Sequence, residues 1–279
     1  MPPARLEDVP PVAHGSMLVV GYGAMAAAMV EGWLAAGMDR AALTLYNPRP
    51  KPVPDGVTFT DTLPDQSFAQ VLLAFKPQMV GTVAPDLARC LSPSSMVISV
   101  LAGVDLAALR EHFPGAGAHV RFMPNLAAAI GKSPNALMAS GVTNAQRAQV
   151  TRLAMMLGTA EWLEDEGQFD LVTALAGSGP GFVYRFIDAL ASGAVALGLE
   201  RDQANRLALQ MVEGAAALAA SLSLDPASLA ARVASKGGMT QASLDVLDRE
   251  GALNRLMEET LRAARDQGSV LNIRQEAER

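Results

Sequence analysis

The chain has 279 residues, a net charge of −6 and a hydrophobic share of 50%. That length suits two domains or one large one, and an acidic chain without a basic, aromatic-rich patch argues against binding to nucleic acid. The single cysteine, Cys90, excludes a disulfide framework and a cysteine metal cluster. It fits a reducing compartment, so we expect a cytoplasmic protein.

Two stretches of the sequence bear on targeting and on membrane insertion. Residues 1–16 are rich in proline and lack the apolar core of a signal peptide, so we expect a mobile tail. The best candidate for a membrane span, residues 182–199, carries Arg185 and Asp188. We therefore expect no membrane-spanning segment.

A dinucleotide site is predicted near the start of the chain. Met17–Val20 is a short apolar run typical of a buried strand, and it leads into Gly21-Tyr22-Gly23-Ala24-Met25-Ala26 and a helical stretch over residues 25–36. This segment matches the dinucleotide-binding fingerprint in its G-x-G-x-x-A form. The first glycine makes the tight turn, the second lets a pyrophosphate approach, and the small third residue permits close helix–strand packing. The alternative is a glycine-rich turn that binds no nucleotide.

The next predicted strand, Leu43–Tyr46, indicates which dinucleotide binds. An NAD site favours an acidic residue after this strand, but residues 41–54 contain no carboxylate. Asn47, Arg49 and Lys51 stand there instead, and such side chains suit a 2′-phosphate. We predict NADPH as the cofactor, with NADH as the second candidate. The alternative is a solvated basic loop.

Strands and helices alternate over residues 17–160, which predicts a Rossmann-like, mostly parallel sheet. Ligands of such sheets bind at the carboxyl ends of the strands. Lys76 and Pro77 follow one predicted strand end and Asn125 follows another, so we expect all three to contact the cofactor. The alternative for Asn125 is a turn residue after proline. The further strands are expected at Val71–Ala74, Met96–Val100 and His119–Phe122, with a helix over Val104–His112.

Residues 161–279 have helical spacing and are rich in alanine. We predict helices over residues 169–176, 180–197, 202–221, 226–234, 240–249 and 252–270. Ala189, Ser192, Gly193 and Ala196 give the second of them a face of small residues suited to packing between subunits. The predicted fold is thus α/β: a Rossmann-like sheet domain followed by an all-α dimerisation domain.

A second ligand site is predicted late in the chain, at Ser235-Lys236-Gly237-Gly238-Met239-Thr240. We expect Thr240 to cap the helix that follows, so that the amides of residues 237–240 lie at a helix N-terminus. Free amides and the helix dipole favour a carboxylate there, and the two glycines let it come close. The alternative is an ordinary turn between two helices.

The sequence offers no evident strong acid for catalysis. None of its three histidines stands in a motif for acid–base chemistry or metal binding, and we expect no metal site. A ketone reductase needs a proton donor for the developing alkoxide, whereas a protonated imine is already electrophilic. The pattern therefore favours a reductase that acts on the C=N bond of a small carboxylate.

From residue 17 onward the chain resembles the pyrroline-5-carboxylate reductases. The resemblance rests on the fingerprint and on Phe75-Lys76-Pro77, Val97–Val104, Met123-Pro124-Asn125, Gly177-Ser178-Gly179-Pro180 and Ser235–Thr240. It implies NAD(P)H-dependent reduction of 1-pyrroline-5-carboxylate to L-proline, the last step of proline biosynthesis. It also implies a homodimer of interlocked helical domains, which in many members assembles further into a decamer.

By position, the resemblance implies that Thr240 is the catalytic residue, which hydrogen-bonds the imine nitrogen. It implies that the substrate carboxylate is held by Ser235, Lys236, Gly237, Gly238 and Met239 together with Thr240. Two features depart from the family: Lys236 replaces a proline, and Leu126-Ala127 replaces Thr-Pro. These departures leave the reaction class in place but admit a related cyclic imine as the substrate.

Two other classes compete with this interpretation. A β-hydroxyacid dehydrogenase shares the two-domain plan. It requires a lysine one turn into the helix that follows its glycine-rich motif, and after Gly177-Ser178-Gly179-Pro180 this chain has Arg185 and then Ala189 at the corresponding place. A non-enzymatic NADP-binding regulator would not need a hydroxyl such as that of Thr240 beside Gly237 and Gly238.

Overall fold

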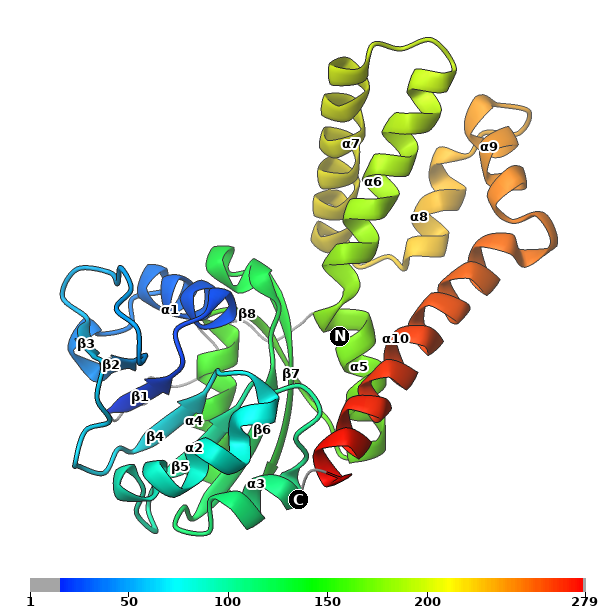
Figure 1. The fold of residues 1–279 in the computed structure, drawn as a ribbon. Helices are drawn as coiled ribbons and strands as arrows, with labels where there is room; N and C mark the ends of the chain where they lie inside the picture. The colour runs from blue at the N-terminus through cyan, green and yellow to red at the C-terminus, as the bar shows by residue number, and fades with distance from the viewer. Residues whose placement is uncertain (1–15, 278–279) are drawn as a thin grey trace. The chain divides into compact units, whose positions relative to one another are not determined.

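A computed structural model describes residues 16–277 of the chain (Figure 1). The predicted tail lies outside these residues except for Ser16, whose carbonyl accepts from Gln70 N at 3.1 Å. Contacts within the described chain form two units: residues 16–177 with 264–277, called here the sheet unit, and residues 178–263, called the helical unit. The predicted domain boundary between residues 160 and 161 stays a prediction.

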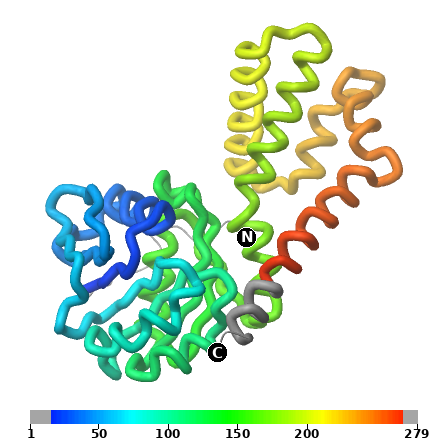
Figure 2. The backbone as a smooth tube through the Cα atoms, viewed as in Figure 1, coloured from blue at the N-terminus to red at the C-terminus, as the bar shows by residue number. Residues whose placement is uncertain are grey.

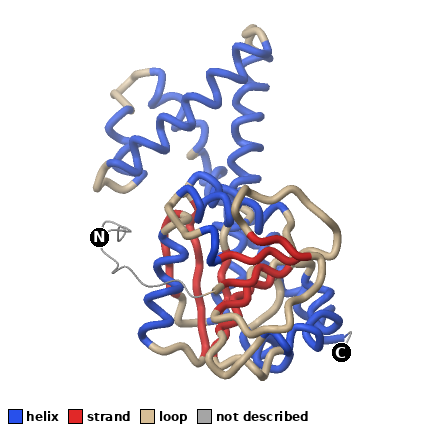
Figure 3. Tube along the Cα trace, turned by 90° about the vertical axis from the view of Figure 1, so that its left-hand side faces the viewer, coloured by secondary structure: helices blue, strands red, loops and turns tan. Residues whose placement is uncertain are grey.

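The sheet unit is built on a sheet whose strands are red in Figure 3. The sheet has eight strands in the order β3-β2-β1-β4-β5-β6-β7-β8. All neighbouring strands are parallel except β6 and β7, which confirms the predicted mostly parallel sheet. The strands are β1 Met17–Val20, β2 Leu43–Tyr46, β3 Thr58–Thr60, β4 Gln70–Leu73, β5 Met96–Ser99, β6 Ala118–Met123, β7 Ser133–Ser140 and β8 Gly158–Trp162.

Helices cover both faces of this sheet. On β1, Met17 and Val19 pack into a core with α1 (Ala24–Ala35) and α4 (Asn144–Met155). Leu18 and Val20 pack into a second core with α2 (Val80–Leu87) and α3 (Leu106–His112). Successive side chains of a strand point to opposite faces, so a strand covered on both sides must be apolar throughout. That requirement explains the continuous run Met-Leu-Val-Val.

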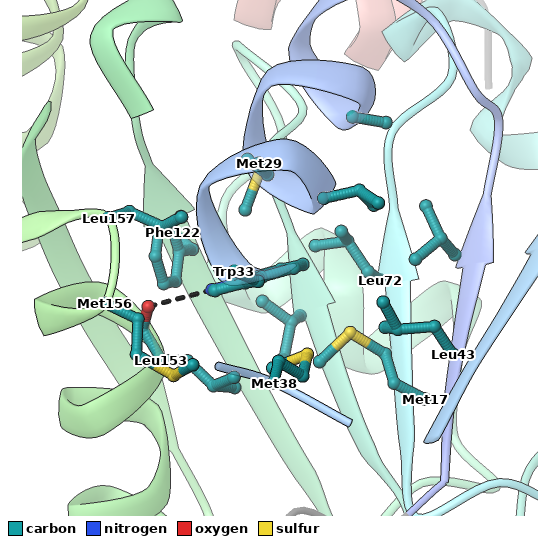
Figure 4. Close-up of a cluster of buried hydrophobic side chains, with 14 of the residues drawn as sticks. Met17, Met29, Trp33, Met38, Leu43, Leu72, Phe122, Leu153, Met156 and Leu157 are labelled. Carbon is teal, nitrogen blue, oxygen red and sulfur yellow. Dashed lines mark hydrogen bonds between the residues drawn. The ribbon is translucent and has the colours of Figure 1, made fainter. Parts of the chain in front are cut away.

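Trp33 fixes α1 against α4 in the first of these cores (Figure 4). Its side chain is 1% exposed, and its indole Nε1 donates to the Leu153 carbonyl at 2.9 Å. Figure 4 shows Met29 and Phe122 in the same cluster. Truncation of such a buried tryptophan removes about 3–5 kcal/mol of stability. Because α1 starts at the glycine-rich turn, this packing also fixes the position of that turn.

The predicted elements agree with the observed ones to within two residues at most ends, but several elements were missed. β3 has only three residues, and β7 begins Ser-Pro-Asn, which is atypical of a strand. α2 contains Pro85, and the short β8 starts at Gly158, which has φ +147°. The polar helix α4 was also missed. The predicted helix over residues 169–176 is a short α5, Phe169–Val172, followed by a π-helical turn, Thr173–Gly177.

The helical unit confirms the predicted change from alternating strands and helices to helices alone. Figure 2 traces its helices along the chain. It holds α6 (Gly179–Ala196), α7 (Arg201–Ser221), α8 (Pro226–Val233), α9 (Met239–Leu247) and the start of α10 (Ala252–Ala277). Within residues 16–277 no single helix is long and apolar enough to cross a membrane. The bent pair α7 and α8, taken together, meets the length and composition expected of a membrane span.

The buried apolar residues of the helical unit are small. Within residues 178–263 they are Ala191, Ala204 and Ala208. Large apolar side chains on the same helices are exposed in the single chain, among them Val183, Tyr184, Phe186, Leu190, Leu207, Leu209, Met211 and Leu218. So much exposed apolar surface on one unit is typical of a protein–protein interface.

Candidate active site

A cavity of about 670 Å³ lies where β1, β2 and β4 end. Its walls bring together most of the cofactor residues predicted from the sequence, and Lys51 is among them. Other lining residues include Phe75, Met79, Thr82, Val83 and Asp86. The predicted residues that line it are Gly21, Tyr22, Gly23, Ala24, Met25, Asn47, Arg49, Lys76 and Pro77. The α2 residues were missed because α2 itself was missed, although Pro77 just before it signals the start of a helix.

Gly21 makes the tight turn after β1. Its φ is +89°, and a Cβ on it would lie 2.9 Å from the carbonyl of Ala74 and from the amide nitrogen of Phe75. Only glycine fits both the conformation and the space. Its own amide donates to the Tyr46 carbonyl at 2.9 Å, so the turn is tied to the end of β2.

Gly23 is the N-cap of α1, and the space around it is open. A Cβ on Gly23 would meet no atom within 4 Å. The first bond of the helix here runs from Ala27 N to the Gly23 carbonyl, so the amides of residues 24–26 precede the helical ladder. No acidic residue stands in the first turn. A phosphate group at this point would meet free amides and the positive end of the helix dipole.

Tyr22, between the two glycines, is buried, with a side chain that belongs to the core under α1. Burial raises the pKa of its phenol, and the charge of Glu31 raises it further. A phenol with a raised pKa stays neutral at ordinary pH and is a weak proton donor. The amide and the carbonyl of Tyr22 both bond side chains of the loop after β2.

The loop after β2 supplies the polar wall of the cavity. Asn47 Oδ1 accepts from the Tyr22 amide at 3.2 Å, and Asn47 Nδ2 donates to the Arg49 carbonyl at 2.6 Å. The Arg49 side chain is exposed along the cavity. Lys76 is exposed on the β4 side of the same cavity. With Asp86 as the acid among the lining residues, the cavity is predominantly cationic, as a phosphate site requires.

Asn125 lies at the end of β6 as predicted, but it does not line this cavity. It is 4% exposed. Its Oδ1 accepts from Ala127 N at 2.9 Å, and its Nδ2 donates to the Ala176 carbonyl at 2.8 Å. These bonds hold a 3₁₀ turn against the π-helical turn, which agrees with the turn alternative. A contact with the cofactor stays a prediction.

The predicted substrate segment joins α8 to α9. Here the prediction that Thr240 caps the helix is wrong, because α9 starts at Met239 and its N-cap is Gly238, which has an extended backbone. The Gly238 amide turns back to the Ser235 carbonyl at 2.9 Å, and Gly237 has φ +74°. This turn leads the chain into the helix two residues earlier than we expected.

Thr240 therefore occupies the first turn of α9, with its side chain exposed. Ser235, Lys236 and Met239 are exposed beside it in the single chain. A Cβ on Gly238 would lie 2.4 Å from Ser235 Oγ, so a larger residue there would require the Ser235 hydroxyl to move. The segment carries a hydroxyl, an ammonium and helix-start amides, but the Gly238 amide already bonds the Ser235 carbonyl and is not free for a ligand. A carboxylate site at this helix start stays a prediction.

His119 has a structural position, whereas His14 lies outside the described residues. His119 is buried, and its Nε2 lies 3.0 Å from the Phe113 carbonyl. Burial lowers the pKa of His119, since the charged form loses its hydration. Across the described residues, no group of three or more His, Cys, Asp and Glu side chains could hold a metal ion.

The doubly covered parallel sheet, the glycine turn at a helix start and the cationic cavity at the strand ends define a Rossmann-type dinucleotide-binding protein. A family model described as pyrroline-5-carboxylate reductase dimerisation matches residues 166–271. The pyrroline-5-carboxylate reductase of Pseudomonas aeruginosa is 34% identical over 260 residues, which cover 90% of this chain and 95% of that protein. Pyrroline-5-carboxylate reductase 2 of Bacillus subtilis is 33% identical over 86% of this chain and 91% of its own. The chain belongs to the pyrroline-5-carboxylate reductase family.

Solved structures agree with the fold. The pyrroline-5-carboxylate reductase of Coxiella burnetii is 28% identical and superposes with a TM-score of 0.83 over 93% of this chain and 99% of that one. The Plasmodium falciparum pyrroline carboxylate reductase, solved with NADP bound, has a TM-score of 0.79 at 22% identity, over 92% of this chain and 98% of that one. Together they confirm the α/β architecture predicted from the sequence.

Proposed function

We propose that this chain catalyses the NADPH-dependent reduction of 1-pyrroline-5-carboxylate to L-proline, the last step of proline biosynthesis. The observation that carries this proposal is the single cavity in which the glycine turn and the Asn47–Arg49 loop share a wall. Membership of the reductase family supports the reaction class. The bound NADPH supplies the hydride for this reaction.

The residues present fit such a cofactor. The amides at the start of α1 and the open space at Gly23 accept a pyrophosphate, and Arg49 faces the cavity with a guanidinium suited to a 2′-phosphate. NADH remains the second candidate. It lacks the phosphate, so its binding would gain nothing from Arg49.

The substrate site that we propose is the start of α9. Backbone amides there and the Lys236 ammonium hold the carboxylate, and Ser235 adds a hydroxyl. The Thr240 hydroxyl bonds the imine nitrogen and fixes the C=N bond in place. When hydride adds to the carbon of that bond, the nitrogen of the protonated imine becomes a neutral amine. Orientation therefore supplies most of the rate, and no strong acid is required.

We further propose the domain limits 17–160 and 161–279, with the second domain as the dimerisation domain. The exposed apolar side chains of the helical unit and the dimerisation model that matches residues 166–271 support a homodimer. A decamer is the higher assembly to look for. Cys90, a free and buried thiol, suits the reducing cytoplasm that we propose as its location.

The test is a direct assay of two reactions with the purified protein. We expect 1-pyrroline-5-carboxylate to drive the oxidation of NADPH, and a 3-hydroxy acid to give no reduction of NADP. The reverse outcome would favour a β-hydroxyacid dehydrogenase. Tight binding of NADPH without turnover of either substrate would favour a regulator, and turnover of only a related cyclic imine would correct the substrate.

A further inference from the structure

Two side chains of one loop hold the backbone of Tyr22 from both sides. The Tyr22 amide donates to Asn47 Oδ1 at 3.2 Å, and the Tyr22 carbonyl accepts from Lys51 Nζ at 2.8 Å. Tyr22 stands between the two glycines of the fingerprint, so its polar backbone groups would otherwise be free in a flexible turn. The loop after β2 therefore fixes the turn that faces the cofactor.

The same loop is itself restrained. Prolines alternate with the polar residues in Asn47-Pro48-Arg49-Pro50-Lys51-Pro52, and each proline fixes its own φ and restricts the residue before it. Asn47 N donates to the Thr60 carbonyl at 3.2 Å, and Asn47 Nδ2 holds the Arg49 carbonyl. Arg49 is thus anchored on one side by Asn47 and on the other by the bond from Lys51.

We propose that Lys51 is a positioning residue for cofactor recognition, a latch that closes the loop carrying Arg49 onto the fingerprint turn. Its ammonium bonds a backbone carbonyl, and both Lys51 and Arg49 line the cavity. A loop already held in its binding conformation loses less entropy when the ligand arrives, and that difference appears as affinity. This inference rests on the proposed function, since it concerns how the NADPH site is formed.

The bond from Lys51 to the Tyr22 carbonyl involves no cofactor atom, so its loss should be measurable in the protein alone. We expect Lys51→Met to speed amide hydrogen exchange in the segment around Tyr22 in the free protein. Lys132→Met removes the same charge from an exposed position that does not line the cavity, and it should leave that segment unchanged. Equal exchange in wild type and Lys51→Met would overturn the proposal, because a residue that only binds phosphate does not order the free turn.

A second experiment measures the affinity for 2′,5′-ADP by calorimetry. It uses a double-mutant cycle of Lys51→Met and Arg49→Gln. A hydrogen bond to a charged group at a partly exposed site supports an expected loss of about 3- to 10-fold for Lys51→Met. If Lys51 positions Arg49, the loss caused by Arg49→Gln shrinks in the Lys51→Met background. Lys51→Arg, which can still donate to the Tyr22 carbonyl, should recover much of the affinity.

Additive losses in this cycle would instead make Lys51 an independent ligand of the phosphate and overturn the proposal. The cofactor itself is tested separately by the wild type. If wild-type protein binds 5′-AMP as tightly as 2′,5′-ADP, the proposed NADPH preference fails, while the exchange experiment still decides whether the latch exists.

Discussion

Arg121 and Glu166 form an ion pair that joins the end of the sheet to the chain leading away from it, with Nη1 3.0 Å from Oε1. The same Oε1 accepts from Leu106 N, the first residue of α3, at 2.9 Å. The Arg121 guanidinium also lies 3.7 Å from the ring centroid of Phe169 in α5. Arg121 is buried, and burial lowers its pKa while the bond to Glu166 opposes that shift. The Glu166 carboxylate thus connects β6 to α3, and the Arg121 guanidinium connects β6 to α5.

We expect Glu166→Gln to destabilise the protein by about 1–3 kcal/mol, since a buried guanidinium then lacks its counter-charge and the carboxylate site is partly exposed. The amide oxygen of glutamine can still accept from Leu106, so the change tests charge rather than the helix start. Urea unfolding would measure it. Glu164→Gln, at an exposed site nearby, is the control, and equal stability of the two variants would show that the pair contributes nothing.

Arg49→Ala should weaken NADPH by about 1–3 kcal/mol, the scale of a lost charge-assisted hydrogen bond. Binding of NADH should change little, because it has no 2′-phosphate. Fluorescence titration with both cofactors gives the two constants, and Arg89→Ala, at an exposed position outside the cavity, controls for net charge. An equal loss for both cofactors would show that Arg49 does not bind the 2′-phosphate.

Thr240→Ala should lower kcat by roughly tenfold or more, with a smaller rise in the KM for the imine, because it removes the hydroxyl but keeps the amides of α9. Thr240→Ser should recover much of that loss. Lys236→Ala should mainly raise the KM, since its charge serves the carboxylate. Steady-state kinetics at saturating NADPH separate these effects. A folded Thr240→Ala enzyme with wild-type kcat would remove Thr240 from the mechanism.

Light scattering after gel filtration should show a dimer or a larger assembly at micromolar concentration. Ala189, Gly193 and Ala196 lie on one exposed face of α6, where small residues allow close helix packing. Ala189→Glu should shift the protein towards monomer, because it places a charge in the proposed interface. Ala107→Glu, the same change on an exposed face of α3, is the control and should leave the assembly unchanged. An active wild-type monomer would refute the proposed homodimer.

Stability should decrease as the pH falls below about 6.5, in part through His119. Its folded pKa is lowered by burial, so above its unfolded pKa both states are neutral and His119 has no effect. Below that pH the unfolded chain binds a proton that the folded chain does not, and unfolding is favoured. His119→Gln should reduce the fall in melting temperature from about pH 7.5 to about pH 5.5. His112→Gln is the control, and an unchanged slope in His119→Gln would exclude this contribution.

Much of the fold could be predicted because local patterns express it directly. Buried parallel strands such as Met17–Val20 are short apolar runs, and the late helices repeat alanine at helical spacing. β7 could not be predicted in this way. It contains Pro134 and the buried Asn135, whose Nδ2 bonds the Ala154 and Thr159 carbonyls. Its conformation is set by neighbours distant in sequence rather than by its own residues.

In the candidate site, too, features set by local sequence could be predicted, whereas features set by contacts with other parts of the chain could not. Gly21 and Arg49 were found because a turn and a strand end fix their places along the chain. Thr240 was expected to cap α9 but lies in its first turn, since Gly238 and Ser235 make the preceding turn through a backbone bond that side-chain preferences do not reveal. The side-chain bonds of Asn125 likewise depend on Ala176, 51 residues away.

The alanine core of the helical unit has a consequence for how this protein responds to dilution. Ala191, Ala204 and Ala208 bury little apolar surface, so in the proposed homodimer a second chain supplies much of the energy that orders α6 and α7. Lowering the protein concentration then acts on the second half of the molecule as a denaturant would. A newly synthesised chain would finish folding only after it meets another, and its melting temperature would rise with the amount of protein in the tube.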